Sequence, residues 1–116
     1  MTILTIYHNP RCSKSRETLA IMEQKNLSCK VVEYLNDPLS ESKIKSLLKQ
    51  LKIPAIELVR TKEKRFSELG LDKNASEADL IKAMAENPVL IERPIVSNGK
   101  TAIIGRPPEN VLKLLS

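Results

Sequence analysis

Apolar and polar residues alternate first at the period of a strand and then at that of a helix. Residues 2–7 read TILTIY, an alternation typical of a short strand. After a polar break, an apolar stripe at helical spacing runs from Ser13 to about Asn26. A second strand is predicted at residues 30–35. A strand, a helix and a strand in this order predict a parallel pair joined by a right-handed crossover.

The middle of the chain has the apolar period of helices. Ser40 can cap a helix in SESKIKSLLKQLKI, which carries four apolar residues at helical spacing. A short helix is predicted at residues 54–60, because proline is tolerated in a first turn. Ser76 and Asp79 form a capping box at the start of SEADLIKAMAEN, and Pro88 ends that helix.

The last third of the chain predicts a hairpin and a helix. Two apolar runs flank Asn98-Gly99 in PIVSNGKTAIIG, a strong short-range hairpin signal, and ENVLKLLS reads as a terminal helix. We therefore expect an α/β chain with a four-stranded mixed sheet, flanking helices and a helical insertion, the outline of a thioredoxin-like fold. No repeat or linker interrupts the 116 residues, so we expect residues 1–116 to form a single domain with the insertion at about 40–88.

Composition and charge bear on which partners this protein binds and on where in the cell we expect it. The net charge is 19 − 14 = +5, but the lysines are dispersed and no basic stripe alternates with aromatic rings, so we expect no nucleic-acid binding. No run approaches the roughly 20 apolar residues of a membrane span, and the first residues lack the features of a secretory signal. We expect a cytoplasmic protein, and a monomer, because no large apolar surface patch is indicated.

Cys12 is placed where a thiol can react. It follows the first predicted strand and a polar loop and precedes the first predicted helix, whose free N–H groups and dipole favour an anion. Arg11, Lys14 and Arg16 add positive potential. This favours a nucleophilic thiolate beside a site for an oxyanion. The alternative is a cysteine that only fills space, but the polar residues around it offer little to pack against.

Other cysteine chemistries do not fit the spacing. Ser15 replaces the second thiol of a C-x-x-C motif. Three residues between Cys12 and Arg16 are too few for a phosphatase-type loop. His8, Cys12 and Cys29 lack the paired spacing of a metal module, so we expect no metal site. Two cysteines in a cytosolic chain also argue against a disulfide, and we interpret Cys29 as a packing residue or a bystander.

Three separated segments, YHNPRCSKSRETL, NPVLIERPIV and IGRP, carry a family resemblance. In order and spacing they are similar to the glutaredoxin-dependent arsenate reductases of bacteria, particularly the shorter members. The resemblance implies a thioredoxin-like fold with a helical insertion. It implies that Cys12 attacks arsenate and that Arg60, Arg93 and Arg106 bind the oxyanion. It also implies a cis peptide bond before Pro94.

The same resemblance implies a mechanism and its partners. Cys12 displaces an oxygen of arsenate to form a covalent adduct, glutathione attacks that adduct, glutaredoxin resolves the mixed disulfide, and arsenite is released. Glutathione is then a co-substrate, and no cofactor is bound. His8 and Ser15 are candidates to support the thiolate through a charge or a hydrogen bond. His8 can equally be an ordinary residue at a strand end.

Two other functions remain open from the sequence. Related proteins of this fold are redox-responsive regulators that bind RNA polymerase, although these typically carry C-x-x-C, which Ser15 interrupts here. A different glutathione-linked thiol transfer is the second alternative.

Overall fold

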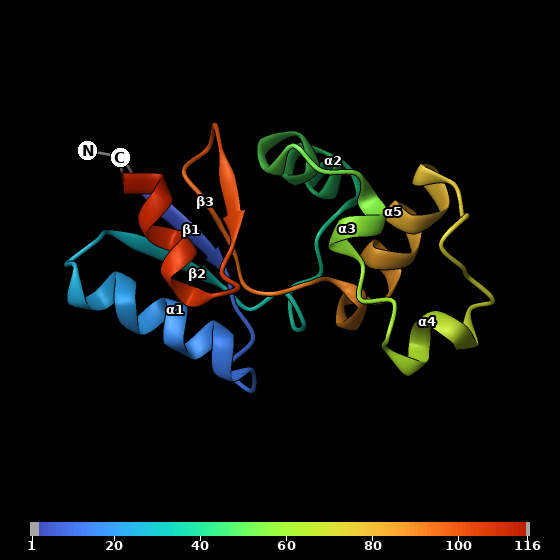
Figure 1. Cartoon of the computed structure of the whole chain (residues 1–116), viewed down its shortest axis with the longest axis horizontal. Coiled ribbons are helices and arrows are strands. Elements are labelled where there is room, and N and C mark those ends of the chain that lie inside the picture. Colours follow the sequence, from blue (N-terminus) through green and yellow to red (C-terminus); the bar gives the residue numbers. More distant parts are fainter. Residues whose placement is uncertain (1–2, 116) are drawn as a thin grey trace. The chain divides into compact units, whose positions relative to one another are not determined.

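The computed structural model describes residues 3–115 and divides them into two compact units. The first unit takes in the chain up to Asp37 and again from Arg93, and the second is formed by Pro38–Glu92. Strands lie in the first unit, and the second is built from helices (Figure 1). No helix among residues 3–115 has the length and apolar character needed to cross a membrane.

The first unit contains a four-stranded mixed sheet with the order β2-β1-β3-β4. Its strands are β1 (Leu4–Tyr7), β2 (Cys29–Val32), β3 (Ile95–Ser97) and β4 (Ala102–Ile104). The β1–β2 pair is parallel and is joined by helix α1 (Ser13–Gln24), as predicted. The β1–β3 and β3–β4 pairs are antiparallel. The predicted four-stranded mixed sheet is therefore confirmed.

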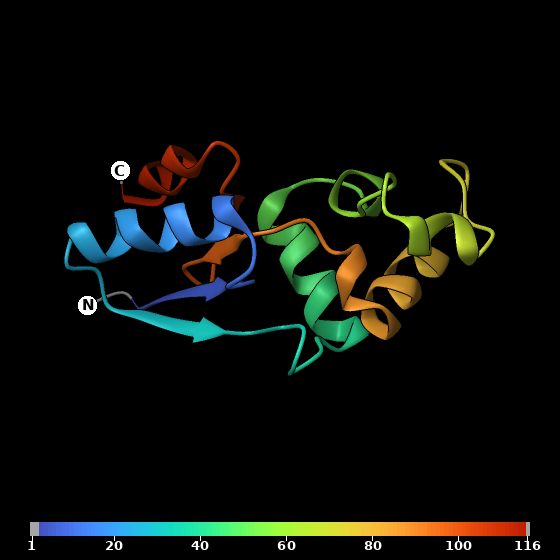
Figure 2. The same ribbon diagram turned by 90° about the horizontal axis from the view of Figure 1, so that it is seen from below.

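Two helices cover one face of this sheet. Helix α1 and the 3₁₀ helix η2 (Pro108–Leu115) lie side by side over the strands in both views (Figures 1 and 2). The core between the helices and the sheet consists of aliphatic residues (Leu4, Ile6, Met22, Val96 and Val111). Burial of this apolar face holds α1 in place, and with it the residue at the helix start.

The second unit is a set of short helices. They are α2 (Glu41–Leu51), α3 (Ala55–Leu58), α4 (Lys64–Glu68), α5 (Glu77–Glu86) and the 3₁₀ helix η1 (Pro88–Leu90). Helix α5 packs against α2, α3 and η1. The predicted capping residues are confirmed, since Ser40 Oγ accepts from Lys43 N and Ser76 Oγ accepts from Asp79 N, each at 3.1 Å.

Several boundaries differ from the sequence predictions. Helix α1 ends at Gln24 because Asn26 takes a left-handed conformation, with φ 55°, and Leu27 N bonds back to Met22 O at 3.1 Å. Strand β2 ends at Val32, not Leu35, since the chain turns there and Glu33 O accepts from the backbone N–H groups of residues 36 and 37.

The ends of the chain also differ. The terminal helix is 3₁₀, and helices α4 and η1 were not predicted. Residue 2 of the first predicted strand and residue 116 of the last predicted helix lie outside the described residues.

Candidate active site

Cys12 is the N-cap residue of α1. Its backbone is extended, with φ −96° and ψ 124°, and its carbonyl accepts the first helical hydrogen bond from Arg16 N at 3.0 Å. Its N–H is bound by Asn9 O at 3.0 Å, so the β1–α1 loop closes as a tight turn. The residue is buried, with 8% of its surface exposed. The sulfur therefore lies at the positive end of a 12-residue helix.

Arg106, one of the predicted arginines, lies close to this sulfur. Its Nη2 lies 3.6 Å from Cys12 Sγ, and its Nε donates to Arg93 O at 2.8 Å. Asn110 Nδ2 binds the carbonyl of Arg106 at 3.0 Å and that of Ile104 at 3.2 Å. These bonds hold the segment after β4 so that a guanidinium faces the thiol, although the two residues are 94 positions apart.

Gly105 makes that approach possible. Its N–H donates to Pro94 O at 2.8 Å. A Cβ atom at this position would lie 2.5 Å from Thr18 Oγ1 and 2.8 Å from Pro94 Cγ. Thr18 is fully buried in α1, where its hydroxyl donates to Lys14 O at 2.8 Å. The absence of a side chain at Gly105 thus lets the end of β4 pack directly on the helix that carries Cys12.

Two peptide bonds near this site differ from the rest of the backbone. The Arg93–Pro94 and Arg106–Pro107 peptide bonds are both cis. Only the first of them was expected from the sequence. Each of them directly follows one of the two arginines, Arg93 and Arg106, that are hydrogen-bonded to each other.

His8 and Ser15 form a buried pair under the cysteine loop. His8 Nδ1 lies 2.7 Å from Ser15 Oγ, and Ser15 Oγ also accepts from Asn9 N at 3.0 Å. Burial lowers the pKa of His8 from 6.5, the nearby charge of Glu33 opposes that change, and Arg16 adds to it. A neutral His8 supplies no positive charge, so its contribution is to hold Ser15 and the loop in place.

Two of the three basic residues beside Cys12 have side-chain partners of their own. Lys14 Nζ lies 3.6 Å from Glu17 Oε2, and Arg16 Nη1 donates to Pro10 O at 3.0 Å. Arg11 N donates to Asn9 Oδ1 at 3.0 Å, while its side chain is exposed. Arg106, which is distant in sequence, adds a guanidinium at 3.6 Å from the sulfur to the positive potential expected from these neighbours.

Arg93 and Arg60 lie in different units. Arg93 is half-buried immediately before β3, and its carbonyl positions Arg106. Arg60 belongs to the helical unit, where Nη1 lies 3.0 Å from Glu63 Oε2 and Nε lies 3.8 Å from Glu92 Oε1. Its role in binding an oxyanion stays a prediction.

Cys29 is separate from this arrangement. It begins β2, pairs in register with Leu4 of β1, and packs at the edge of the core. Burial, together with the negative charge of Glu23, raises the pKa of the Cys29 thiol. Among residues 3–115, no group of three or more histidine, cysteine, aspartate or glutamate residues is arranged to hold a metal ion.

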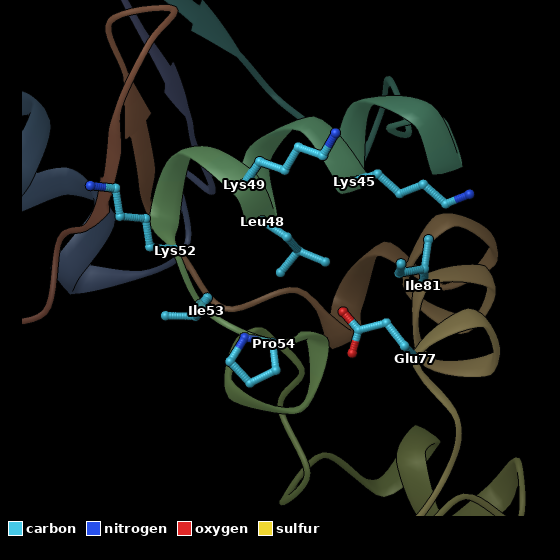
Figure 3. A pocket seen from close by; sticks show the side chains of 8 residues that line it. All are labelled: Lys45, Leu48, Lys49, Lys52, Ile53, Pro54, Glu77 and Ile81. Atoms are coloured by element: carbon cyan, nitrogen blue, oxygen red, sulfur yellow. The ribbon is translucent and has the colours of Figure 1, made fainter.

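A hollow is found in each unit. In the helical unit, a depression of about 440 Å³ is lined by lysines of α2 and its C-cap, by apolar residues and by Glu77 (Figure 3). Glu77 also accepts a hydrogen bond from Ala55 N. The lining of this depression contains no cysteine or histidine. In the first unit, a cavity of about 380 Å³ adjoins the cysteine loop and is lined by seven residues (His8, Asn9, Pro10, Arg11, Glu33, Leu35 and Asn36).

Sequence reasoning missed the residues that support this site from elsewhere in the chain. Thr18, Gly105 and Asn110 hold the arginine segment against α1. A buried threonine in the middle of an amphipathic helix was the available signal, because such a hydroxyl needs a partner.

A mixed sheet of this order, with a cysteine at the start of the helix that follows an inner strand, defines a thioredoxin-like fold with a thiol site. The chain belongs to the ArsC family, whose model matches residues 7–114. It is 48% identical over 112 residues to the arsenate reductase of Haemophilus influenzae, covering 95% of this chain and 97% of that protein.

Two other relatives show the same likeness. The chain is 52% identical over 113 residues to the Escherichia coli K12 protein YfgD, described as uncharacterized, covering 95% of this chain and 94% of that one. Among solved structures, the arsenate reductase from Vibrio cholerae is 46% identical with a TM-score of 0.93, covering 97% of each chain.

Proposed function

We propose that this chain is an arsenate reductase that converts arsenate to arsenite with Cys12 as the nucleophile. The observation that carries the proposal is the 3.6 Å approach of Arg106 Nη2 to Cys12 Sγ at the N-terminus of α1. The names of the relatives from Haemophilus influenzae and Vibrio cholerae support the substrate.

The charges around Cys12 suit a small oxyanion. Arsenate is a tetrahedral dianion at neutral pH, so a negatively charged sulfur repels it unless fixed positive charge lies nearby. A guanidinium remains charged and offers paired planar donors to two oxygens. We assign this role to Arg106 and to its bonded neighbour Arg93. The first N–H groups of α1 supply further donors to an anion.

The proposed reaction has three steps. The Cys12 sulfur attacks arsenic, an As–O bond breaks, and that oxygen leaves as water after taking up a proton. A glutathione thiolate then attacks the Cys12 sulfur, and the S–As bond breaks with its electron pair on arsenic, so As(V) becomes As(III) and arsenite leaves. A glutaredoxin thiol finally attacks the mixed disulfide and frees Cys12. Two thiols supply the two electrons, and no bound cofactor is needed.

The need for outside thiols follows from the residues available. Ser15 occupies the second position of the C-x-x-C motif and is bonded to His8. The raised pKa of Cys29 keeps that thiol protonated and poorly nucleophilic. The reaction also requires reduced thiols, which the cytoplasm maintains. We therefore propose a cytoplasmic enzyme, acting as a monomer.

The test is an arsenite-release assay with purified protein, glutathione and glutaredoxin. We expect release by the wild type and by the control Cys29→Ser, and none by Cys12→Ser. Equal release by wild type and Cys12→Ser would remove Cys12 from the mechanism. Absence of release by the wild type with every thiol tested would reject the proposal, in favour of another thiol transfer or of a regulator.

Arg106→Lys provides a second test of the same site. Lysine keeps the charge, but a single ammonium cannot reproduce both the bond to Arg93 O and the approach to Cys12 Sγ. We expect kcat/KM for arsenate to fall roughly tenfold to a hundredfold, as for loss of one charged hydrogen bond. Unchanged kinetics would show that Arg106 does not act on the substrate.

A further inference from the structure

The cavity beside the cysteine loop lies where open sheets usually bind ligands. Its lining comes from two segments that directly follow the carboxyl ends of the parallel strands β1 and β2, residues 8–11 and 33–36. In α/β sheets, the crevice outside the carboxyl ends of the strands is the common ligand site. Its volume of about 380 Å³ is in the range of small-molecule pockets.

Two side chains of opposite charge line the cavity. They are Arg11 and Glu33. Neither side chain has an ion-pair partner among residues 3–115, although other charged residues of the chain do. An exposed positive and an exposed negative group around one hollow are complementary to a ligand that carries both charges.

His8 adds a hydrogen-bond donor at the buried wall of the cavity. Ser15 Oγ is fully buried and accepts from Asn9 N, and within the described residues the acceptor available to its own proton is His8 Nδ1 at 2.7 Å, so we assign that proton to this bond. Because burial also keeps His8 neutral, the remaining ring proton is on Nε2. Within the described chain, Nε2 has no hydrogen-bond partner. An acceptor such as a carboxylate can take this proton.

We propose that this cavity binds the α-ammonium and α-carboxylate of the small thiol co-substrate, with the carboxylate on Arg11 and His8 and the ammonium on Glu33. The identification as a co-substrate site rests on the proposed function. Arg11, which lines the cavity, directly precedes Cys12. A thiol on the residue next to the ammonium and carboxylate head lies roughly two residue lengths, about 7 Å, from that head, so a ligand of this kind suits a site beside the cysteine loop. Glutathione carries such a group at its γ-glutamyl end, and free cysteine carries it next to the thiol.

The test measures binding without reaction. S-methylglutathione, which cannot form a disulfide, is titrated into the wild type, Arg11→Gln and Glu33→Gln, and binding is followed by NMR. We expect each variant to bind roughly tenfold more weakly, as for loss of one charged hydrogen bond. The controls Glu23→Gln and Lys25→Gln remove exposed charges of the same unit outside the cavity, and we expect wild-type binding from both.

A blocked ligand identifies which group meets which residue. N-acetyl-S-methylglutathione lacks the ammonium, so it should bind the wild type about tenfold more weakly than S-methylglutathione does. The Glu33→Gln substitution should not weaken the binding of this blocked ligand any further, because the group that Glu33 binds is already absent. Arg11→Gln should continue to weaken it. S-methylcysteine binding with the same dependence on Arg11 and Glu33 would support recognition of the amino-acid head alone.

The outcomes separate this inference from the proposed function. Equal binding of S-methylglutathione by wild type, Arg11→Gln and Glu33→Gln would overturn the inference, as would no binding by the wild type at millimolar concentration. Arsenite release supported equally by mercaptoethanol and glutathione, in all three proteins, would overturn it while leaving the reductase intact. The expected binding pattern without arsenite release would support the cavity as a zwitterion site and reject the reductase.

Discussion

Gly105→Ala tests whether the close packing of β4 on α1 positions Arg106. The new methyl group would lie 2.5 Å from Thr18 Oγ1 and 2.8 Å from Pro94 Cγ, distances that real Cβ contacts do not reach. Thr18 cannot yield freely, because its hydroxyl donates to Lys14 O and its side chain is fully buried. Either this hydrogen bond breaks or the end of β4 moves away from α1.

Both responses have a measurable cost. Overpacking a well-packed site costs about 1–3 kcal/mol, and a lost hydrogen bond adds about 1 kcal/mol, so we expect the free energy of unfolding to fall by about 2–4 kcal/mol. Movement of β4 also carries Arg106 away from Cys12 Sγ, and a misplacement of about 1 Å can reduce turnover by about a hundredfold. Urea unfolding and the arsenite-release assay measure the two effects.

Gly99→Ala is the matched control. Gly99 has φ 94°, and a Cβ atom added there would meet nothing within 4 Å, so alanine adds backbone strain without a steric clash. We expect a loss of about 1–2 kcal/mol in stability with wild-type turnover. The double variant Thr18→Ala/Gly105→Ala removes the nearest clashing atom, Thr18 Oγ1, but leaves Pro94 Cγ, so it should recover part of the stability lost in Gly105→Ala. The reasoning is refuted if Gly105→Ala unfolds and turns over like the wild type.

Three further predictions concern the buried pair and the remaining arginine. Ser15→Ala leaves Asn9 N and His8 Nδ1 without their shared partner, and we expect the free energy of unfolding in urea to fall by about 1–3 kcal/mol. A urea midpoint equal to that of the wild type would contradict the pairing. The pKa of His8 is lowered in the folded state, so the unfolded chain binds the extra proton first; stability should fall as pH drops below 6.5 and level off below the folded pKa. This fall should be smaller in His8→Gln, and equal slopes in both proteins would contradict it. Arg60→Lys should lower kcat/KM for arsenate if Arg60 binds the oxyanion, whereas unchanged kinetics would limit Arg60 to its ion pairs with two glutamates.

Local signals predicted most of the elements. Alternation in residues 4–7, the apolar stripe of α1 and the serines at positions 40 and 76 act within a few residues of one another, and the structure contains the strand, the helix and both caps. The predicted hairpin also forms, although Asn98 N bonds to Thr101 O at 3.0 Å, so Gly99 and Lys100 are its central residues. Helix α4 was missed because a five-residue helix is too short for a detectable apolar period.

The amino-acid sequence by itself determined that Cys12 lies between a strand and a helix, because the signals for the strand, the turn and the helix are contiguous there. Tertiary structure alone decided which distant groups face it. Arg106 reaches the sulfur because the antiparallel register of β3 and β4 returns the chain to α1, and Gly105 permits the approach. Likewise, Glu33 joins the cavity that Arg11 also lines because β1 and β2 are parallel neighbours. Such contacts depend on strand register and packing, which no local pattern specifies.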